Sequence, residues 1–148
     1  MQLSQKTQYA LRALLELAMR RGNGNTPVSE IARVQGIPPR FLEQILAQLR
    51  MAGLVESRRG VNGGYLLALD PRRLTVGKVI RFLEGPLRPV RYVDGVEAGG
   101  PVSTRCAFED LWERAQEAVE NVYDSTTFHD LIQEELSAQE NYVANWVI

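Results

Sequence analysis

Histidine and cysteine are nearly absent from this chain of 148 residues, which contains one of each. The single cysteine, Cys106, cannot form a disulfide within the chain, which fits a cytoplasmic protein. One histidine and one cysteine also provide no spacing that places a base beside a nucleophile. We therefore expect no catalytic centre, no metal site and no enzyme activity.

Long apolar runs are missing as well. No stretch approaches the roughly 18 uninterrupted apolar residues that a membrane-spanning helix needs. The N-terminal region does not resemble a secretory signal, because Arg12 and Glu16 interrupt its apolar residues at helical spacing. The sequence therefore predicts a cytoplasmic protein without a membrane partner.

Charge is divided unevenly along the chain, although the formal net charge is only −1 at pH 7. Residues 1–83 carry 13 Lys and Arg against 5 Asp and Glu, a balance of +8. Residues 84–148 carry 4 against 13, a balance of −9. A basic half of this kind indicates a polyanionic partner such as nucleic acid.

The basic half contains the pattern of a helix-turn-helix. Apolar spacing predicts helices over residues 3–21, 28–35 and 39–52, and Gly36 forms the turn between the second and third. In such a motif the later helix enters the major groove, where Arg, Gln and Glu side chains can recognise base edges. The candidates on its exposed side are Arg40, Glu43, Gln44 and Gln48.

Residues 54–69 change from helical periodicity to a β-hairpin with a basic, glycine-rich tip. Asn62-Gly63-Gly64 is expected to supply positive φ angles in the turn, and glycine lets the backbone approach another surface closely. Arginine at such a tip suits a narrow minor groove. The tip candidates are Arg58, Arg59, Gly60, Gly63 and Gly64, and the phosphate-contact candidates at the start of the first helix are Lys6, Thr7 and Tyr9.

The acidic half is predicted to begin with an irregular segment and to continue as helices. A fourth helix over residues 76–84, capped by Thr75, precedes this segment at residues 86–103. The longest helix is predicted over residues 104–123, and its apolar stripe favours pairing with a second copy. This stripe comprises Phe108, Leu111, Trp112, Ala115, Val119 and Val122.

A last helix is expected after the cap Ser125-Thr126-Thr127, followed by an apolar tail at residues 139–148 that docks on the body or on the partner copy. The predicted fold class is mainly α with a small β-hairpin wing. The predicted organisation has three parts: a winged helix-turn-helix domain at residues 1–85, a sensor or effector loop at residues 86–103, and a dimerisation helix with its tail at residues 104–148.

Three stretches together resemble the Rrf2 family of bacterial transcription regulators: LSQKTQYALRALLELA, VSEIARVQGIPPRFLEQILAQLRMAGLVESRRGVNGGYLLA and LTVGKVIRFLEG. The resemblance is dense over residues 1–85 and continues loosely through Cys106 to Trp112. It implies a homodimeric winged-helix repressor or activator, with a long helix that crosses to the partner subunit. It further implies Glu43 and Gln44 in the major groove and Arg59 in the minor groove.

Many members of that family hold an iron–sulfur cluster on three cysteines, whereas only Cys106 stands at a matching position here. No cofactor is therefore expected, and cluster binding through unusual ligands is kept as an alternative. Cys106 itself has three interpretations: a buried small apolar residue, a redox-active sensor thiol near a helix N-terminus, or a remnant of a lost cluster site.

The favoured function is a sequence-specific DNA-binding transcriptional regulator, with repression as the expected mode and a homodimer as the active form. One alternative is a winged-helix interaction module that docks an enzyme partner through the acidic half. Another is an iron–sulfur-dependent regulator. A third is a small-molecule sensor whose effector pocket is framed by residues 86–103 and Trp112.

Overall fold

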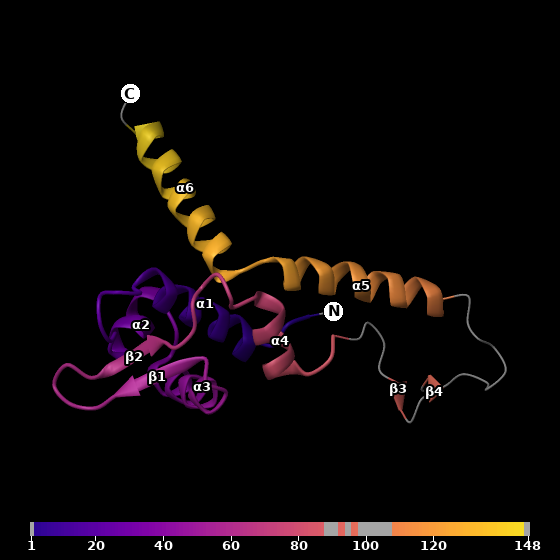
Figure 1. The fold of residues 1–148 in the computed structure, drawn as a ribbon, viewed down its shortest axis with the longest axis horizontal. Helices are drawn as coiled ribbons and strands as arrows, with labels where there is room; N and C mark the ends of the chain where they lie inside the picture. The colour runs from indigo at the N-terminus through magenta and orange to yellow at the C-terminus, as the bar shows by residue number, and fades with distance from the viewer. Residues whose placement is uncertain (1, 88–91, 94–95, 98–107, 147–148) are drawn as a thin grey trace.

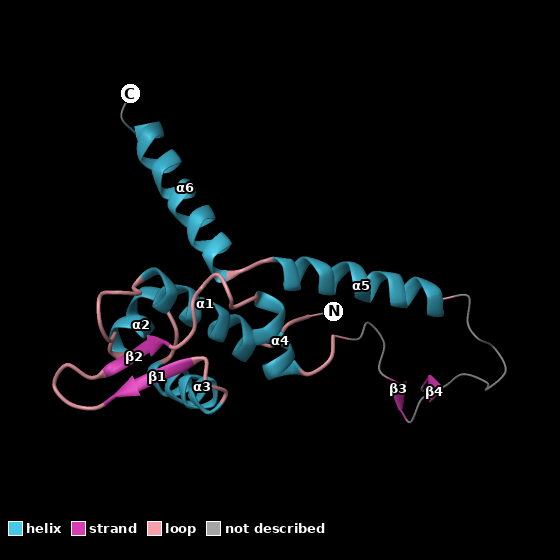
Figure 2. Cartoon of the chain, viewed as in Figure 1, coloured by secondary structure: helices cyan, strands magenta, loops and turns pink. Residues whose placement is uncertain are grey.

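Two helices lead away from a body that is built from residues 2–87 (Figure 1). The computed structural model describes residues 2–87, 92–93, 96–97 and 108–146. Within these ranges the chain is mainly helical, with two small antiparallel hairpins (Figure 2). The elements are α1 Gln5–Met19, α2 Val28–Gln35, α3 Pro39–Met51, β1 Val55–Arg58, β2 Gly64–Leu67, α4 Val76–Glu84, β3 Tyr92–Val93, β4 Val96–Glu97, α5 Glu109–Ser125 and α6 Phe128–Trp146.

Local capping explains where several helices begin and end. The Ser4 side chain accepts a hydrogen bond from the Thr7 amide at 3.2 Å, and Thr75 accepts one from the Lys78 amide at 3.3 Å. Gly36 ends α2 in the left-handed conformation with a φ of 60°. The predicted cap at Thr75 and the predicted turn at Gly36 are confirmed.

Helix α1 lies at the centre of the body and contacts α2, α3, α4, β2 and α6. Its Leu14 is fully buried against the apolar side of α3, which includes Leu46. Each such side chain contributes about 1.5–3 kcal/mol by leaving water. The core thereby fixes one face of α3 inward and leaves the opposite face in solvent.

The wing is a β1–β2 hairpin with a short third strand segment beside it. The register runs from Val55 opposite Leu67 to Arg58 opposite Gly64. On the other edge of β2, Thr26 and Tyr65 exchange two backbone hydrogen bonds, each 2.8 Å long. The loop that precedes α2 therefore pairs with the outer edge of β2 and holds the wing against the body.

Helices α5 and α6 meet at a junction that is fastened to α4. The Val76 amide donates to the Thr126 carbonyl at 3.0 Å, and the Phe128 amide donates to the Leu74 carbonyl at 2.9 Å. Arg81 of α4 forms an ion pair with Asp124 of α5. The Phe128 side chain is fully buried in the body, so it holds the start of α6 in place.

Two expectations for the acidic half are wrong. The longest described helix is α6, with 19 residues against 17 in α5, and α5 begins at Glu109. The stretch expected as a separate tail instead continues α6 up to Trp146. Docking on its own body is wrong, because Trp146 is 75% exposed, and docking on a partner copy stays a prediction. A capping box of Thr127 and Asp130, with bonds of 2.9 and 3.1 Å, starts α6. No Gly or Pro follows within α6 to stop it.

Leu136, in the middle of α6, is 42% exposed. The irregular segment predicted at residues 86–103 lies mostly outside the described ranges, although β3 and β4 pair within it. None of the helices in the described ranges is both long and apolar enough to cross a membrane.

Candidate nucleic-acid interface

The outer face of α3 carries a row of polar side chains with free hydrogen-bonding groups. Because Leu42, Ile45, Leu46 and Leu49 face the core, the positions between them point to solvent. Arg40, Glu43, Gln44 and Gln48 are all exposed, as the sequence predicts. Within the described ranges none of these four side chains has a hydrogen-bond or ion-pair partner. Their donors and acceptors are therefore available to base edges.

The wing tip presents two exposed arginines, Arg58 and Arg59, beside a tight turn. The turn is closed by a 2.9 Å hydrogen bond from the Gly63 amide to the Gly60 carbonyl. The Asn25 side chain donates to the Asn62 carbonyl at 3.2 Å, which ties the tip to the loop before α2. The tip is thus held at both its base and its turn.

The expectation of positive φ angles in the turn is confirmed at Gly64 and wrong at Gly63. Positive φ angles occur at Gly60 and Gly64 rather than at Gly63. A Cβ at Gly63 would lie 2.5 Å from the Arg58 carbonyl oxygen, and one at Gly64 would lie 2.3 Å from that of Thr26. A side chain at position 63 would therefore collide with the wing itself, and one at position 64 would collide with the loop before α2, whereas the space around Gly60 is open.

The start of α1 lies beside the start of α3. The ring of Tyr9 packs edge-on against Phe41, with centroids 5.7 Å apart, and the Arg12 guanidinium lies 5.7 Å from the Tyr9 centroid. Lys6 is partly exposed in the same turn. Thr7, however, is fully buried and donates to Glu84 at 2.6 Å, so the expected phosphate contact of Thr7 is wrong.

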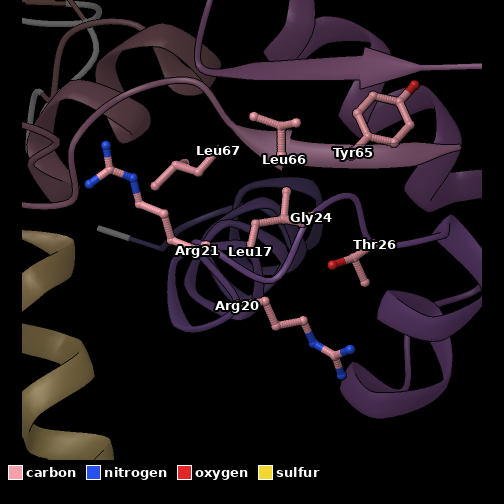
Figure 3. A pocket seen from close by; sticks show the side chains of 9 residues that line it. Leu17, Arg20, Arg21, Gly24, Thr26, Tyr65, Leu66 and Leu67 are labelled. Atoms are coloured by element: carbon pink, nitrogen blue, oxygen red, sulfur yellow. The ribbon is translucent and has the colours of Figure 1, made fainter. Parts of the chain in front are cut away.

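A cavity of about 310 Å³ lies behind the wing, between the end of α1 and β2 (Figure 3). Figure 3 shows the side chains of Arg20 and Arg21 extending away from one another. Arg20 is paired with Glu16 and Glu30, and Arg21 lies 3.7 Å from Asp70. These carboxylates neutralise the guanidinium groups, so the cavity walls offer little attraction to an anionic ligand.

Helix α5 keeps its apolar stripe uncovered in the single chain. None of its side chains is buried, and Leu111 is 43% and Val122 61% exposed. Phe108 and Trp112 stack on one another with centroids 5.9 Å apart. The remaining predicted stripe residues, Ala115 and Val119, are exposed and half-buried respectively. The stripe is therefore free to meet another apolar surface.

An iron–sulfur cluster does not fit the residues of this chain. Such clusters are held by four ligands, mostly thiolates, and the chain contains one cysteine. Cys106 lies outside the described residues. Within the described ranges no group of three or more His, Cys, Asp or Glu side chains could hold a metal ion.

Sequence reasoning missed Glu84, Asn25 and Thr26, which hold the interface together rather than face outward. Glu84 sits at the end of a predicted helix, where nothing in the sequence distinguishes it from a solvated residue. Thr26 carried one signal, a β-branched residue directly before Pro27, which favours an extended backbone.

A polar recognition helix beside an arginine-tipped hairpin defines a winged helix-turn-helix DNA-binding protein. The sequence profile of the Rrf2 family, described as iron-dependent transcriptional regulators, matches residues 3–134. The chain therefore belongs to the Rrf2 family, as the resemblance in its sequence indicates. Its members are transcriptional regulators, a class distinct from enzymes.

Known relatives are similar to this chain over most of their length. The HTH-type transcriptional regulator CymR of Bacillus subtilis is 40% identical over 143 residues, which cover 97% of this chain and 98% of CymR. IscR of Aliivibrio salmonicida is 34% identical over 89% of this chain and 77% of its own. The solved structure of B. subtilis CymR, the global cysteine regulator, superposes with a TM-score of 0.78 over 90% of this chain and 98% of that one. IscR of T. potens superposes with a TM-score of 0.77 at 36% identity, over 94% of this chain and 91% of that one.

Proposed function

We propose that this DNA-binding regulator is a homodimeric repressor in which each subunit reads one half-site. The observation that carries the proposal is the row of unpartnered polar side chains on α3 beside the arginine wing. Gln44 and Glu43 read bases in the major groove, and Arg58 and Arg59 enter the adjacent minor groove. Lys6 and Tyr9 contact phosphate and set the orientation of the body on the duplex.

The three-part division of the chain belongs to the same proposal. Residues 1–85 bind DNA, residues 86–103 receive the signal, and residues 104–148 join two subunits. Blocking of a promoter by the bound dimer accounts for repression without any further contact. The chain is proposed to work without an iron–sulfur cluster, since it has one cysteine. The description of B. subtilis CymR as a global cysteine regulator favours a sulfur-linked signal instead.

The DNA contacts are tested by replacing Gln44 and Arg59 with alanine together. We expect the double variant to lose about 2–6 kcal/mol of binding free energy, because each lost base contact costs about 1–3 kcal/mol. Fluorescence anisotropy on DNA from the chain's own upstream region measures the affinity. Wild-type affinity should itself fall about 10³-fold or more between 50 and 200 mM salt.

Arg72→Ala with Gln133→Ala is the matched control for this experiment. Arg72 is an exposed residue next to Pro71, whose carbonyl accepts a hydrogen bond from the His129 amide at the start of α6. Gln133 is exposed on α6. This control removes the same residue types elsewhere and should bind DNA nearly as well as wild type. Equal affinity of wild type and the Gln44, Arg59 variant would reject the proposed reading surface.

The dimer is tested by placing a charge in the stripe of α5. Leu111→Glu should convert the dimer to a monomer, because an unpaired carboxylate buried in an apolar interface costs several kcal/mol. Light scattering coupled to size-exclusion chromatography measures the mass. Glu113→Gln, on the other face of α5, should leave the mass unchanged. A Leu111→Glu protein that stays dimeric would place the interface elsewhere.

A further inference from the structure

The carboxylate of Glu84 joins the end of α4 to the first turn of α1. Its Oε1 atom accepts hydrogen bonds from the Ser4 amide at 2.8 Å and from the Thr7 hydroxyl at 2.6 Å. These bonds, together with the charge of Lys6, hold the pKa of Glu84 below its usual value. Thr7 is fully buried, so its hydroxyl has a fixed place in the packing.

The other end of α4 is attached to the junction between α5 and α6. Thr75 pairs with Thr127, and the Val76 amide bonds to the Thr126 carbonyl at 3.0 Å. Arg81, one turn before Glu84, is paired with Asp124 of α5. Helix α4 therefore connects the α5–α6 junction to the first turn of α1.

That first turn belongs to the surface proposed to face DNA. Lys6 lies between Ser4 and Thr7, which Glu84 holds, and Tyr9 packs on Phe41 of α3 with centroids 5.7 Å apart. A shift of the first turn would therefore move Lys6 and disturb the contact with the recognition helix. A displacement of about 1 Å is enough to weaken a contact that depends on position.

We infer that Glu84 is a positioning residue for DNA binding, which fixes the first turn of α1 to α4 and so places Lys6 and Tyr9 against the duplex. The inference rests on the proposed DNA contacts of Lys6 and Tyr9. It assigns a role in DNA affinity to an acidic residue that is not among the proposed DNA contacts.

The direction of the change in DNA affinity distinguishes a positioning role of Glu84 from a purely electrostatic one. Removal of a carboxylate near a DNA-facing surface reduces repulsion of phosphate, so charge alone predicts tighter binding by a Glu84 variant. Loss of positioning predicts weaker binding. A weaker complex therefore cannot be attributed to the change in charge.

Glu84→Ala in the full chain is the principal test. DNA affinity is measured by fluorescence anisotropy between 50 and 200 mM salt, alongside thermal unfolding and the oligomeric mass. We expect about tenfold weaker binding and a salt dependence reduced by about one phosphate contact per subunit. Glu134→Ala, an exposed glutamate on α6, is the matched control and should bind as wild type does.

Two milder variants keep the test valid if Glu84→Ala unfolds. Glu84→Gln retains an acceptor oxygen for Ser4 and Thr7 and should bind more tightly than Glu84→Ala. Thr7→Val preserves the buried shape, removes the hydroxyl donor and leaves every charge in place. It should weaken DNA binding in the same direction as Glu84→Ala.

A double-mutant cycle with Lys6→Ala decides whether Glu84 acts through this end of α1. If it does, Lys6→Ala should reduce the DNA-binding free energy less in the Glu84→Ala background than in the wild-type protein. Full additivity of the losses in binding free energy from Lys6→Ala and Glu84→Ala would overturn the inference. It would also be overturned if Glu84→Ala and Thr7→Val both bound DNA as tightly as wild type, or more tightly. If Lys6→Ala alone has no effect, the inference also fails, while the α3 and wing variants still report on the proposed function separately.

Discussion

Replacing Phe128 with alanine should lower the free energy of unfolding by about 3–5 kcal/mol, the usual cost of deleting a buried phenylalanine ring. Phe128 is fully buried and is the first residue of α6, so the ring anchors this helix to the body. The Phe128 amide also bonds to the Leu74 carbonyl at 2.9 Å, and this bond needs the helix start to stay in place. Urea denaturation at one fixed protein concentration measures the loss, because the stability of the proposed homodimer would depend on concentration.

Phe82→Ala provides the comparison, because Phe82 is a phenylalanine of the same body with 47% of its surface exposed. Its removal should cost about 1 kcal/mol or less. If Phe128→Ala were no more destabilising than Phe82→Ala, the start of α6 would not be anchored as described. Far-UV circular dichroism should show that the Phe128 variant keeps its helices at low urea.

Replacing Gly64 with alanine should destabilise the protein by about 2–6 kcal/mol and weaken DNA binding at the wing. Two costs add at this position. Gly64 has a φ of 151°, which strains any residue with a side chain by about 1–3 kcal/mol. The new Cβ would also lie 2.3 Å from the Thr26 carbonyl oxygen, and such overpacking costs about 1–3 kcal/mol.

Gly60→Ala separates these two costs, because Gly60 has a φ of 110° and a Cβ added there would meet no atom within 4 Å. It should show the backbone strain alone, about 1–3 kcal/mol. Thermal and urea unfolding of both variants would give the difference, which measures the closeness of the wing to Thr26. Equal destabilisation by the two substitutions would mean that the wing can move away from this loop at little cost.

Much of the winged-helix domain can be predicted from the sequence because its boundaries are set locally. Ser4, Thr75 and Gly36 act within a few residues, so their capping and turn roles are legible in a single stretch of chain. The outward direction of Gln44 follows equally from helical periodicity once Leu42 and Ile45 are placed in the core.

The features that the sequence does not predict depend on contacts between distant parts of the chain. Glu84 bonds to Ser4 and Thr7 far away in sequence, and no local pattern marks a helix-end glutamate as a partner for either. The positive φ of Gly64 is predictable from the turn, but the close approach at this position is not, because the neighbour of Gly64 is Thr26 rather than a residue of the hairpin. The full length of α6 is equally hard to predict, because the large apolar side chains at its end, such as Val143 and Trp146, are exposed and do not pack into the core.

The separation of charge between the body and the two projecting helices gives the chain a large electric dipole. Residues 108–146 hold one Lys or Arg against ten Asp and Glu, and they form the helices that lead away from the basic body (Figure 1). As the protein diffuses toward DNA, the field of the phosphates turns the basic end forward and the acidic helices backward. Collisions in the wrong orientation are thus disfavoured before contact, and this guidance fades beyond about 10 Å at 0.1 M salt.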